Sequence, residues 1–388
     1  MFPRRPLGIP SVSEAGNRRG SRAWDESDVR IRPNKKGTRP RTKNRPAYDD
    51  AVTGRIVTVD RGRYTAVVDE DTADERLIVA ARARELRRSA VVAGDLVALV
   101  GDLSGGPDSL ARLVRVEERR TVLRRSADDS DPIERVVVAN ADQLVIVVAA
   151  ANPEPRTGFI DRALVAAYDA GIAPLLCITK ADIRDPAELL ANYEHLDLRV
   201  IISGTATDTA GIEATSDDGA SARLSHPAVD ALRQELDGQV SVLLGHSGVG
   251  KSTMVNALTG STRATGGVNA VTGRGRHTSS SAIALKAADS SPGTWIIDTP
   301  GIRSFGLAHV EADRILSAFP DLEPGTERCE RGCKHDDRAV DCGLDGWVAE
   351  GSAGESGPVR LASLRRLLSA GMSEARAQAM DVKELGTQ

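Results

Sequence analysis

A phosphate-binding loop is the clearest chemical signal in this sequence. Residues 245–252 read Gly-His-Ser-Gly-Val-Gly-Lys-Ser and follow an apolar run at residues 240–244. The glycines allow backbone N–H groups to close around a phosphate, because no Cβ intrudes. Lys251 can reach the β- and γ-phosphates, and the hydroxyl of Ser252 can reach Mg²⁺. The sequence therefore predicts a nucleotide site where a strand passes into a helix.

A carboxylate and a glycine after a later apolar run extend the phosphate side of this site. Asp298 ends the run that begins at Trp295, and Pro300-Gly301 lets a backbone N–H approach the γ-phosphate. Asp298 is placed to hold Mg²⁺ through water. Between the two motifs, residues 266–281 are rich in Gly, Arg and Ser, which cannot pack a core. We expect a mobile loop there, with Thr278 reaching the metal.

A third motif, Thr179-Lys180-Ala181-Asp182, is suited to read a guanine base. Asp182 can accept hydrogen bonds from the ring N–H and the exocyclic amine of guanine, and the stem of Lys180 can cover the base. A backbone N–H at Ser203-Gly204, after the next apolar run, can meet the guanine carbonyl. These placements favour GTP over ATP, and competition between the two nucleotides would decide the choice.

The predicted site is drawn from several stretches of the chain. The residues predicted to bind GTP are Thr179, Lys180, Asp182, Ser203, Gly204, Gly245, His246, Ser247, Gly248, Val249, Gly250, Lys251, Ser252, Thr253, Asp298 and Gly301. The predicted magnesium ligands are Ser252, Thr278 and Asp298.

Catalysis by this site needs a group that orients water. Ile302 stands where many GTPases have a glutamine for this purpose, and an isoleucine cannot orient water. Hydrolysis is therefore either slow or assisted by another group. We take His277, together with Thr278, as the catalytic candidates, since an imidazole can orient or activate water near neutral pH. The equal alternative is that His277 is an exposed or RNA-contacting loop residue.

A second metal site is indicated by Cys329, Cys333, His335 and Cys342. Three thiolates and one imidazole favour tetrahedral Zn²⁺ with no open position, which is a structural site. Cysteines clustered beside a histidine indicate metal binding in a reducing compartment, and they do not indicate disulfide bonds. Unligated cysteines are the alternative. Cys177 lies within an apolar run and is expected to be a plain buried thiol.

The charge is distributed unevenly along the 388 residues. The formal net charge is −4, yet residues 1–48 hold thirteen Lys and Arg against four Asp and Glu. A basic tail on an acidic body suggests that the tail seeks nucleic acid, with a solubilising disordered tail as the alternative. No apolar run approaches the roughly 20 residues that span a bilayer, and no secretory signal opens the chain. We therefore expect a cytoplasmic protein that does not associate with a membrane.

The pattern of apolar runs predicts three folded parts after a basic disordered tail at residues 1–50. Residues 51–122 hold short β-rich runs that suggest a five-stranded, RNA-binding barrel of the oligonucleotide-binding type. Residues 123–306 alternate strands and helices, as in a mostly parallel sheet covered on both faces. Within them, residues 204–226 are polar and are expected to form a loop. Residues 307–388 suggest a small helical, zinc-binding domain.

The order of these motifs resembles the circularly permuted GTPases, because the guanine motif at 179–182 precedes the phosphate loop at 245–252. The Gly54-Arg-Ile-Val opening, the Gly-Arg-Gly-Arg-His-Thr stretch at 273–278 and the terminal Cys/His cluster narrow the resemblance to the RsgA (YjeQ) family. It covers roughly residues 51–370. The departures from the family pattern include Thr179, where asparagine is commoner, and His246, where glutamine is commoner.

The resemblance implies an oligonucleotide-binding barrel, a permuted GTPase domain and a C-terminal zinc domain. It also implies a function, late maturation of the bacterial 30S ribosomal subunit, with GTP hydrolysis stimulated by that subunit. The implied partners are the 30S subunit with its 16S rRNA, and GTP or GDP. The expected cofactors are one structural zinc ion and Mg²⁺ carried with GTP, and we expect a monomer. The alternative is an RNA-binding assembly module that binds nucleotide but hydrolyses little.

Overall fold

The structure, a computed structural model, describes eight stretches of the chain: residues 48–60, 62–86, 89–126, 134–204, 211–215, 221–260, 282–299 and 312–369. The basic tail lies outside these stretches. So do the two catalytic candidates, His277 and Thr278, as well as Gly301 and Ile302.

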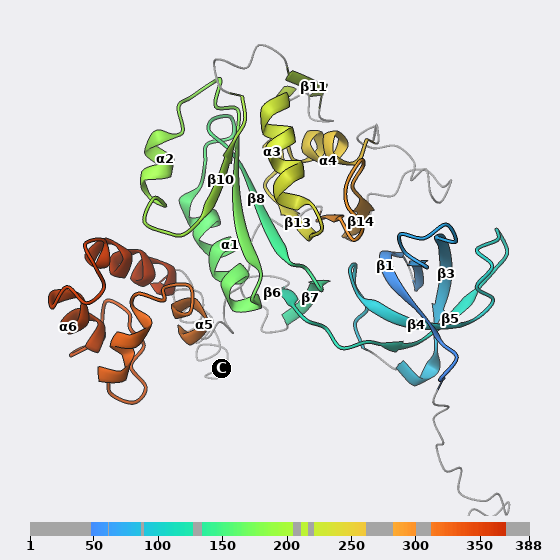
Figure 1. The fold of residues 1–388 in the computed structure, drawn as a ribbon, viewed down its shortest axis with the longest axis horizontal. Helices are drawn as coiled ribbons and strands as arrows, with labels where there is room; N and C mark the ends of the chain where they lie inside the picture. Colours follow the sequence, from blue (N-terminus) through green and yellow to red (C-terminus); the bar gives the residue numbers. More distant parts are fainter. Residues whose placement is uncertain are drawn as a thin grey trace, which may run out of the picture. The chain divides into compact units, whose positions relative to one another are not determined.

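The first folded part is a closed five-stranded barrel, as the sequence predicts. Its strands are β1 (Val52–Asp60), β2 (Arg63–Val68), β3 (Arg76–Arg82), β4 (Leu96–Gly101) and β5 (Ala111–Val116). They close in the order β1-β2-β3-β5-β4 (Figure 1), with β3 and β5 parallel and the other neighbours antiparallel. Alternate side chains fill the interior, and a short 3₁₀ turn, η2 (Arg84–Leu86), follows β3.

A hairpin links the barrel to the second part. Its strands, β6 (Val122–Ser126) and β7 (Glu134–Ala139), pair antiparallel. An isolated bridge joins Ala93 of the barrel to Val138 of β7. Gly94 is packed so closely there that a Cβ would lie 2.2 Å from the carbonyl oxygen of Ala139. The barrel and the following sheet thus meet through tightly packed backbone.

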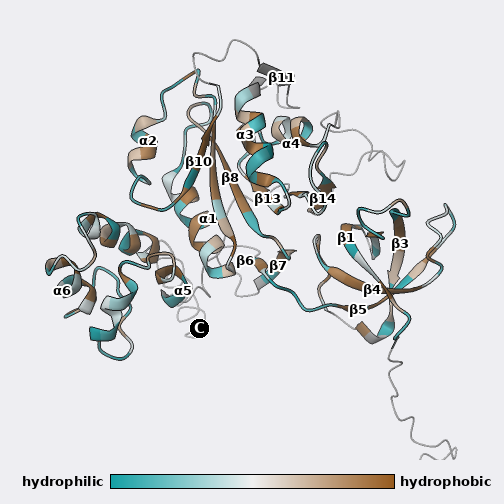
Figure 2. Ribbon diagram, viewed as in Figure 1, coloured by the Kyte–Doolittle hydropathy of each residue, from teal (hydrophilic) through white to brown (hydrophobic). Residues whose placement is uncertain are grey.

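The second part is built on a six-stranded sheet in the order β10-β9-β8-β13-β15-β14. Five strands run parallel, and β14 pairs antiparallel at one edge. The strands are β8 (Gln143–Ala149), β9 (Ala173–Thr179), β10 (Arg199–Ile202), β13 (Val240–Leu244), β14 (Ile283–Lys286) and β15 (Trp295–Asp298). Every residue of β8 and β13 is buried, as strands covered on both faces require, and Figure 2 shows their apolar character.

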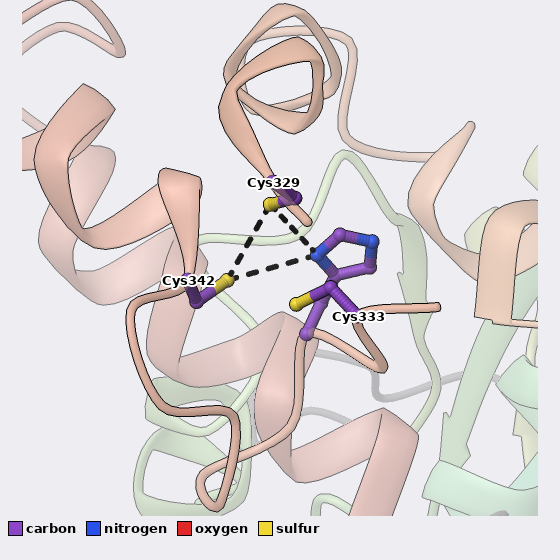
Figure 3. Close-up of side chains that lie close together, drawn as sticks. Cys329, Cys333 and Cys342 are labelled. Carbon is purple, nitrogen blue, oxygen red and sulfur yellow. Dashed lines mark hydrogen bonds between the residues drawn. The ribbon is translucent and has the colours of Figure 1, made fainter. Parts of the chain in front are cut away.

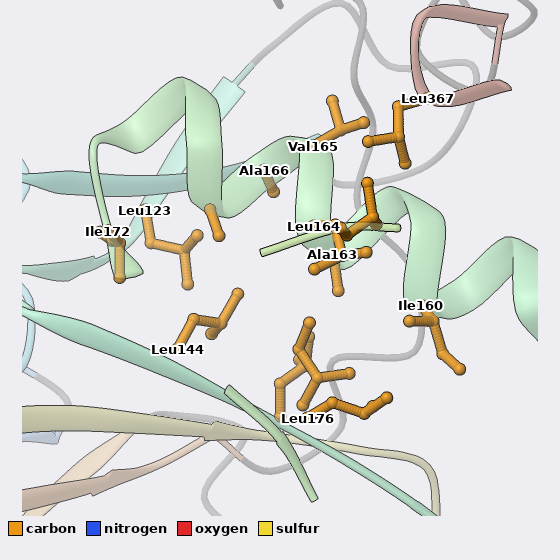
Figure 4. Packing of buried hydrophobic residues seen from close by; sticks show 14 of the residues in the cluster. Leu123, Leu144, Ile160, Ala163, Leu164, Val165, Ala166, Ile172, Leu176 and Leu367 are labelled. Atoms are coloured by element: carbon orange, nitrogen blue, oxygen red, sulfur yellow. The ribbon is translucent and has the colours of Figure 1, made fainter. Parts of the chain in front are cut away.

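Helices cover both faces of this sheet. On one face α1 (Thr157–Ala170) packs on Leu144 and Leu176, and Leu367 packs with the same cluster (Figure 4). On the other face α3 (His226–Leu236) and α4 (Lys251–Thr259) pack on the alternate residues of β8. The short helix α2 (Ala187–Ala191) follows the guanine motif. The predicted α/β architecture with a mostly parallel sheet is confirmed.

The expectation of a loop at residues 204–226 is wrong in part. Strands β11 (Gly211–Thr215) and β12 (Ser221–Ser225) form a two-stranded antiparallel ribbon, and α3 begins directly afterwards. The register pairs Ile212 with Leu224 and Ala214 with Ala222. Such a ribbon satisfies its own backbone hydrogen bonds despite its polar composition. The alternation of apolar residues with period two was the signal that the overall polarity obscured.

The C-terminal part consists of short helices: α5 (Ala312–Leu316), the 3₁₀ helix η3 (Glu323–Arg328), α6 (Gly343–Ala349) and a last helix at residues 357–369. Two arginines of the last helix join it to the segment after α2. Arg360 binds Asp321 at 2.7 and 2.8 Å and donates to the carbonyl of His195 at 2.7 Å. Arg366 stacks over Tyr193.

Across the described stretches, no helix is both long and apolar enough to cross a membrane.

Candidate functional site

The phosphate loop follows β13 and opens α4, the strand–loop–helix context that its motif requires. A Cβ on Gly245 would lie 2.6 Å from the carbonyl oxygen of Val147, so only glycine fits at this point. Gly250, the residue before α4, has a φ of +95°, a conformation that glycine adopts without strain. The loop therefore has the backbone that an anion cradle needs.

Lys251, the first residue of α4, and Asp298, the last residue of β15, converge beside this loop. The ammonium of Lys251 pairs with the Asp298 carboxylate and also lies 3.3 Å from the carbonyl oxygen of Thr299. Both side chains are less than one-fifth exposed. The hydroxyl of Thr299 donates to the carbonyl of Leu243 at 2.7 Å, which fixes the end of β15 against β13. A cation and a carboxylate thus stand where phosphates and Mg²⁺ are predicted.

The guanine motif is joined to the phosphate loop through Thr179, the position that departs from the family pattern. The Thr179 hydroxyl, fully buried, donates to the carbonyl oxygen of Val249 at 2.6 Å, and it lies 3.3 Å from that of Val148. The bond spans β9, β8 and the loop after β13. Threonine at this position therefore ties the two halves of the site together.

The predicted base-reading groups lie together at the carboxyl ends of β9 and β10. Asp182 is exposed, and Gly204 is so close that a Cβ would lie 2.5 Å from its carboxylate oxygen. The N–H of Ala181 donates to the carbonyl of Ser203 at 3.1 Å. Lys180 is only 4% exposed, and its ammonium donates to the carbonyl of Asn152. The turn after β8, which the sequence did not single out, thus helps to position Lys180.

His246 packs against the protein interior. Its ring lies 4.4 Å from the ring of Phe159, centroid to centroid, at an interplanar angle of 48°. Phe159 is buried at the start of α1. The side chain of His246 therefore anchors the phosphate loop to α1, a role that the sequence alone did not indicate.

The cysteine and histidine cluster is brought together by the C-terminal part. The ligand atoms of Cys329, Cys333, His335 and Cys342 all lie within 4.8 Å of one another. The Cys329 and Cys342 sulfurs are 3.9 Å apart, and they lie 3.5 and 3.6 Å from Nδ1 of His335. Figure 3 shows the three labelled thiols turned toward one another. This group can hold one metal ion.

The distances allow the fit of a tetrahedral ion to be tested. Metal–sulfur bonds of about 2.3 Å and metal–nitrogen bonds of about 2.0–2.1 Å give edges of roughly 3.8 Å for S–S and 3.6 Å for S–N. The observed separations between Cys329, His335 and Cys342 agree with these edges within about 0.1 Å. In addition, the N–H of Gly343 donates to the Cys329 sulfur at 3.1 Å, as a partner of a thiolate ligand would.

Burial shifts the pKa of two groups of the cluster and of the remaining thiol. Burial lowers the pKa of His335, which favours the neutral imidazole, the form that binds a metal. Burial, with the neighbouring Cys329, raises the pKa of Cys342 to about 11. Burial alone raises the pKa of Cys177 to about 12. Cys177 is therefore an inert interior thiol, as predicted.

Known proteins of related sequence were found for most of this chain. The family model described as RsgA GTPase matches residues 116–308. The small ribosomal subunit biogenesis GTPase RsgA of Pseudomonas aeruginosa is 38% identical over 281 residues, which are 72% of this chain and 75% of that protein. The RsgA of Azotobacter vinelandii is 36% identical over 287 residues, 72% of this chain and 74% of that protein.

Two solved structures share the fold. YjeQ from Thermotoga maritima has a TM-score of 0.54 at 22% identity and covers 82% of this chain and 98% of its own. YloQ, described as a circularly permuted GTPase, has a TM-score of 0.55 at 18% identity and covers 84% and 97%. Their fold agrees with the sheet in which the guanine motif precedes the phosphate loop along the chain. The chain belongs to the RsgA GTPase family and is a circularly permuted GTPase, an enzyme that hydrolyses GTP.

Proposed function

We propose that this protein binds the small (30S) ribosomal subunit, promotes its late maturation, and hydrolyses GTP to GDP and phosphate there. The observation that carries the proposal is the joining of base-reading and phosphate-binding elements at one edge of the sheet, through the Thr179–Val249 hydrogen bond. The printed names of the relatives, which are small ribosomal subunit biogenesis GTPases, supply the partner. Assembly of ribosomes in bacteria places the protein in the cytoplasm.

The roles of the described site residues follow from their positions. The backbone of the loop from Gly245 to Gly250 cradles the phosphates, and Lys251 neutralises their charge. Ser252 and Asp298 are the groups that would hold Mg²⁺, which supplies further charge neutralisation when bound with GTP. Asp182 accepts the guanine donors. Catalysis is then mainly a matter of position and charge.

Three of the residues proposed for the site lie outside the described part of the chain. Thr278 is proposed as a further magnesium ligand and His277 as the residue that orients water, and Gly301 is proposed to contact the γ-phosphate. The support for His277 is the isoleucine at position 302, which cannot orient water itself. Replacing His277 by alanine should abolish stimulated hydrolysis and leave nucleotide affinity intact.

The metal held by the cysteine cluster is proposed to be one structural Zn²⁺. The donor set of three thiolates and one imidazole favours zinc over magnesium or calcium, which prefer oxygen ligands. All four protein ligands together leave no open position, so we assign no catalytic role to this ion.

The barrel is proposed as an RNA-binding element for 16S rRNA, with the basic tail as an accessory contact. If the tail neutralises about six phosphates, removal of residues 1–47 should change one slope, that of the logarithm of the subunit-binding constant against the logarithm of the salt concentration. This slope should become less steep by about five. We propose that the protein is a monomer.

The deciding experiment is GTP hydrolysis by the purified protein with and without 30S subunits. We expect turnover to rise strongly when subunits are added, and a GTP analogue to strengthen subunit binding. Equal turnover with and without subunits, together with binding that does not depend on nucleotide, would instead support an RNA-binding module with little hydrolysis. Competition by ATP should be weak.

A further inference from the structure

The turn between β2 and β3 is strongly acidic although it belongs to a barrel proposed to bind RNA. Residues 69–75 read Asp-Glu-Asp-Thr-Ala-Asp-Glu, so five of the seven residues are acids. A turn of this charge would repel an RNA backbone. Its side chains must therefore serve another contact, and the structure shows which one. The barrel and the sheet belong to one compact unit that begins at Tyr48.

The acidic turn contacts β14 and β15, the strand pair at the phosphate side of the GTPase sheet. The indole N–H of Trp295 donates to the Glu70 carboxylate. The ammonium of Lys286 lies 2.6 Å from both Asp71 and Glu75. The backbone N–H of Gly293 donates to Asp71 at 2.7 Å. Three acids of the turn thus meet the last residue of β14, the first residue of β15 and the turn between these strands.

A cation from the barrel completes this contact. Arg55 of β1 pairs with Glu70 at 3.0 Å, and its guanidinium lies 5.8 Å from the centre of the Trp295 ring. Trp295 is 4% exposed. The Glu70 carboxylate therefore accepts from two side chains that also face each other. The contact is specific in direction, because indole and guanidinium donate and cannot accept.

The residues that the acidic turn contacts lie on the strands that lead to Asp298, the proposed magnesium ligand. In the β14–β15 ladder, Lys286 is opposite Trp295 and Ile283 is opposite Asp298. Asp298 is three residues beyond Trp295 on one continuous strand, about 10 Å along it. Thr299 then fixes the far end through its bond to Leu243. A displacement at Trp295 is therefore carried along β15 to Asp298.

We infer that Glu70, Asp71 and Glu75 of the barrel, through Trp295 and Lys286, are positioning residues that set the place of Asp298 for GTP hydrolysis. This inference rests on the proposed function, because it concerns the same reaction. It also couples the barrel to the reaction site, because RNA binding that displaces the barrel would displace β15 and with it Asp298. Although the chain passes from the barrel into the base-reading half of the sheet, this contact is made on the phosphate side.

The test compares variants that break or keep the contact. Glu70→Ala removes both acceptors, whereas Glu70→Gln keeps one for the Trp295 indole. Trp295→Phe keeps the ring and removes the donor, and Lys286→Met removes the cation. The control is Asp74→Asn on the same turn, because the described hydrogen bonds of Asp74 are made by its backbone within the turn.

The measurement is GTP hydrolysis by the full chain on saturating 30S subunits, as a function of GTP and of Mg²⁺. For Glu70→Ala and Lys286→Met we expect kcat to fall about tenfold, because a displaced carboxylate orders the site less well. The Mg²⁺ concentration at half-maximal rate should rise severalfold, and the KM for GTP should stay within about twofold, since the phosphate loop and the guanine motif are untouched. Glu70→Gln should recover part of the loss, and Asp74→Asn should match the original protein.

Thermal melting and zinc content of each variant identify those that fail to fold, and Trp295→Phe then provides an independent test. Variants that fold but keep the original kcat and Mg²⁺ requirement would overturn the inference. The same holds if KM rises while the Mg²⁺ requirement is unchanged. If the original protein itself shows no stimulated hydrolysis, the proposed function fails, which is a distinguishable result.

Discussion

The two proposed metal-binding regions of this protein are built in different ways. The cysteine and histidine cluster, proposed to bind zinc, takes its four candidate ligands from residues 329–342, and local turns and the start of α6 bring the ligand atoms within 4.8 Å of one another. The proposed magnesium site takes Ser252 from the start of α4, which follows β13, and Asp298 from the end of β15, and these two strands are neighbours in the sheet. The first geometry is carried by one segment, and the second by the order of a sheet. A site of the second kind can be adjusted from a distance.

Loss of the zinc cluster should give the largest effect. In Cys342→Ala, bound zinc should fall from about one ion per chain to nearly none, and the C-terminal part should lose several kcal/mol of stability. Metal analysis and thermal melting measure both quantities. Cys177→Ala, which removes a buried thiol outside the cluster, is the matched control and should retain zinc. Unchanged zinc in Cys342→Ala would show that this cysteine is not a ligand.

GTP affinity should be unchanged in Cys342→Ala, which separates the two regions. In Lys251→Ala the affinity for GTP should instead fall by about 100-fold or more, because bonds between a cation and phosphate oxygens are lost. Titration with a fluorescent GTP analogue would measure the Kd. Lys334→Ala, an exposed lysine beside the zinc ligands, is the control. If both variants bound GTP equally well, the assignment of the phosphate loop would be wrong.

Base selectivity should change in Asp182→Asn. The amide cannot accept both guanine donors, so GTP affinity should fall about 30-fold, equivalent to about 2 kcal/mol. Xanthosine triphosphate, which has a carbonyl in place of the amine, should gain affinity because the new amide donates to it. Measuring both nucleotides distinguishes a change of selectivity from general damage, which would weaken both.

The smallest expected effect concerns the bond between the two halves of the site. Thr179→Val preserves shape but leaves the Val249 carbonyl without its donor, which should weaken GTP binding about fivefold, or about 1 kcal/mol. Thr179→Ser keeps the hydroxyl and should restore most of the affinity. Equal Kd values for Thr179→Val and the original protein would mean that the halves are held together by the sheet alone.

Much of the fold was readable from the sequence because burial on two faces leaves a continuous apolar run. The apolar run at residues 240–244, predicted as the strand that leads into the phosphate loop, matches β13 residue for residue. The ribbon of β11 and β12 was not predicted, because its composition is polar. Strand β14 was also not predicted, since a short antiparallel edge strand has little pattern of its own.

By itself, the sequence determined the chemical motifs of this protein: the phosphate loop, the candidate guanine motif, the cysteine and histidine cluster, and the motif order of a permuted GTPase. These features depend on residue types at fixed short spacings, which survive without knowledge of distant contacts. Only the tertiary structure decided what joins them. Thr179 reaches Val249 across the sheet, His246 packs on Phe159, and the acidic turn meets Lys286 and Trp295, more than 200 residues away. Such pairs have no sequence signal, because burial and sheet order alone bring them within bonding distance.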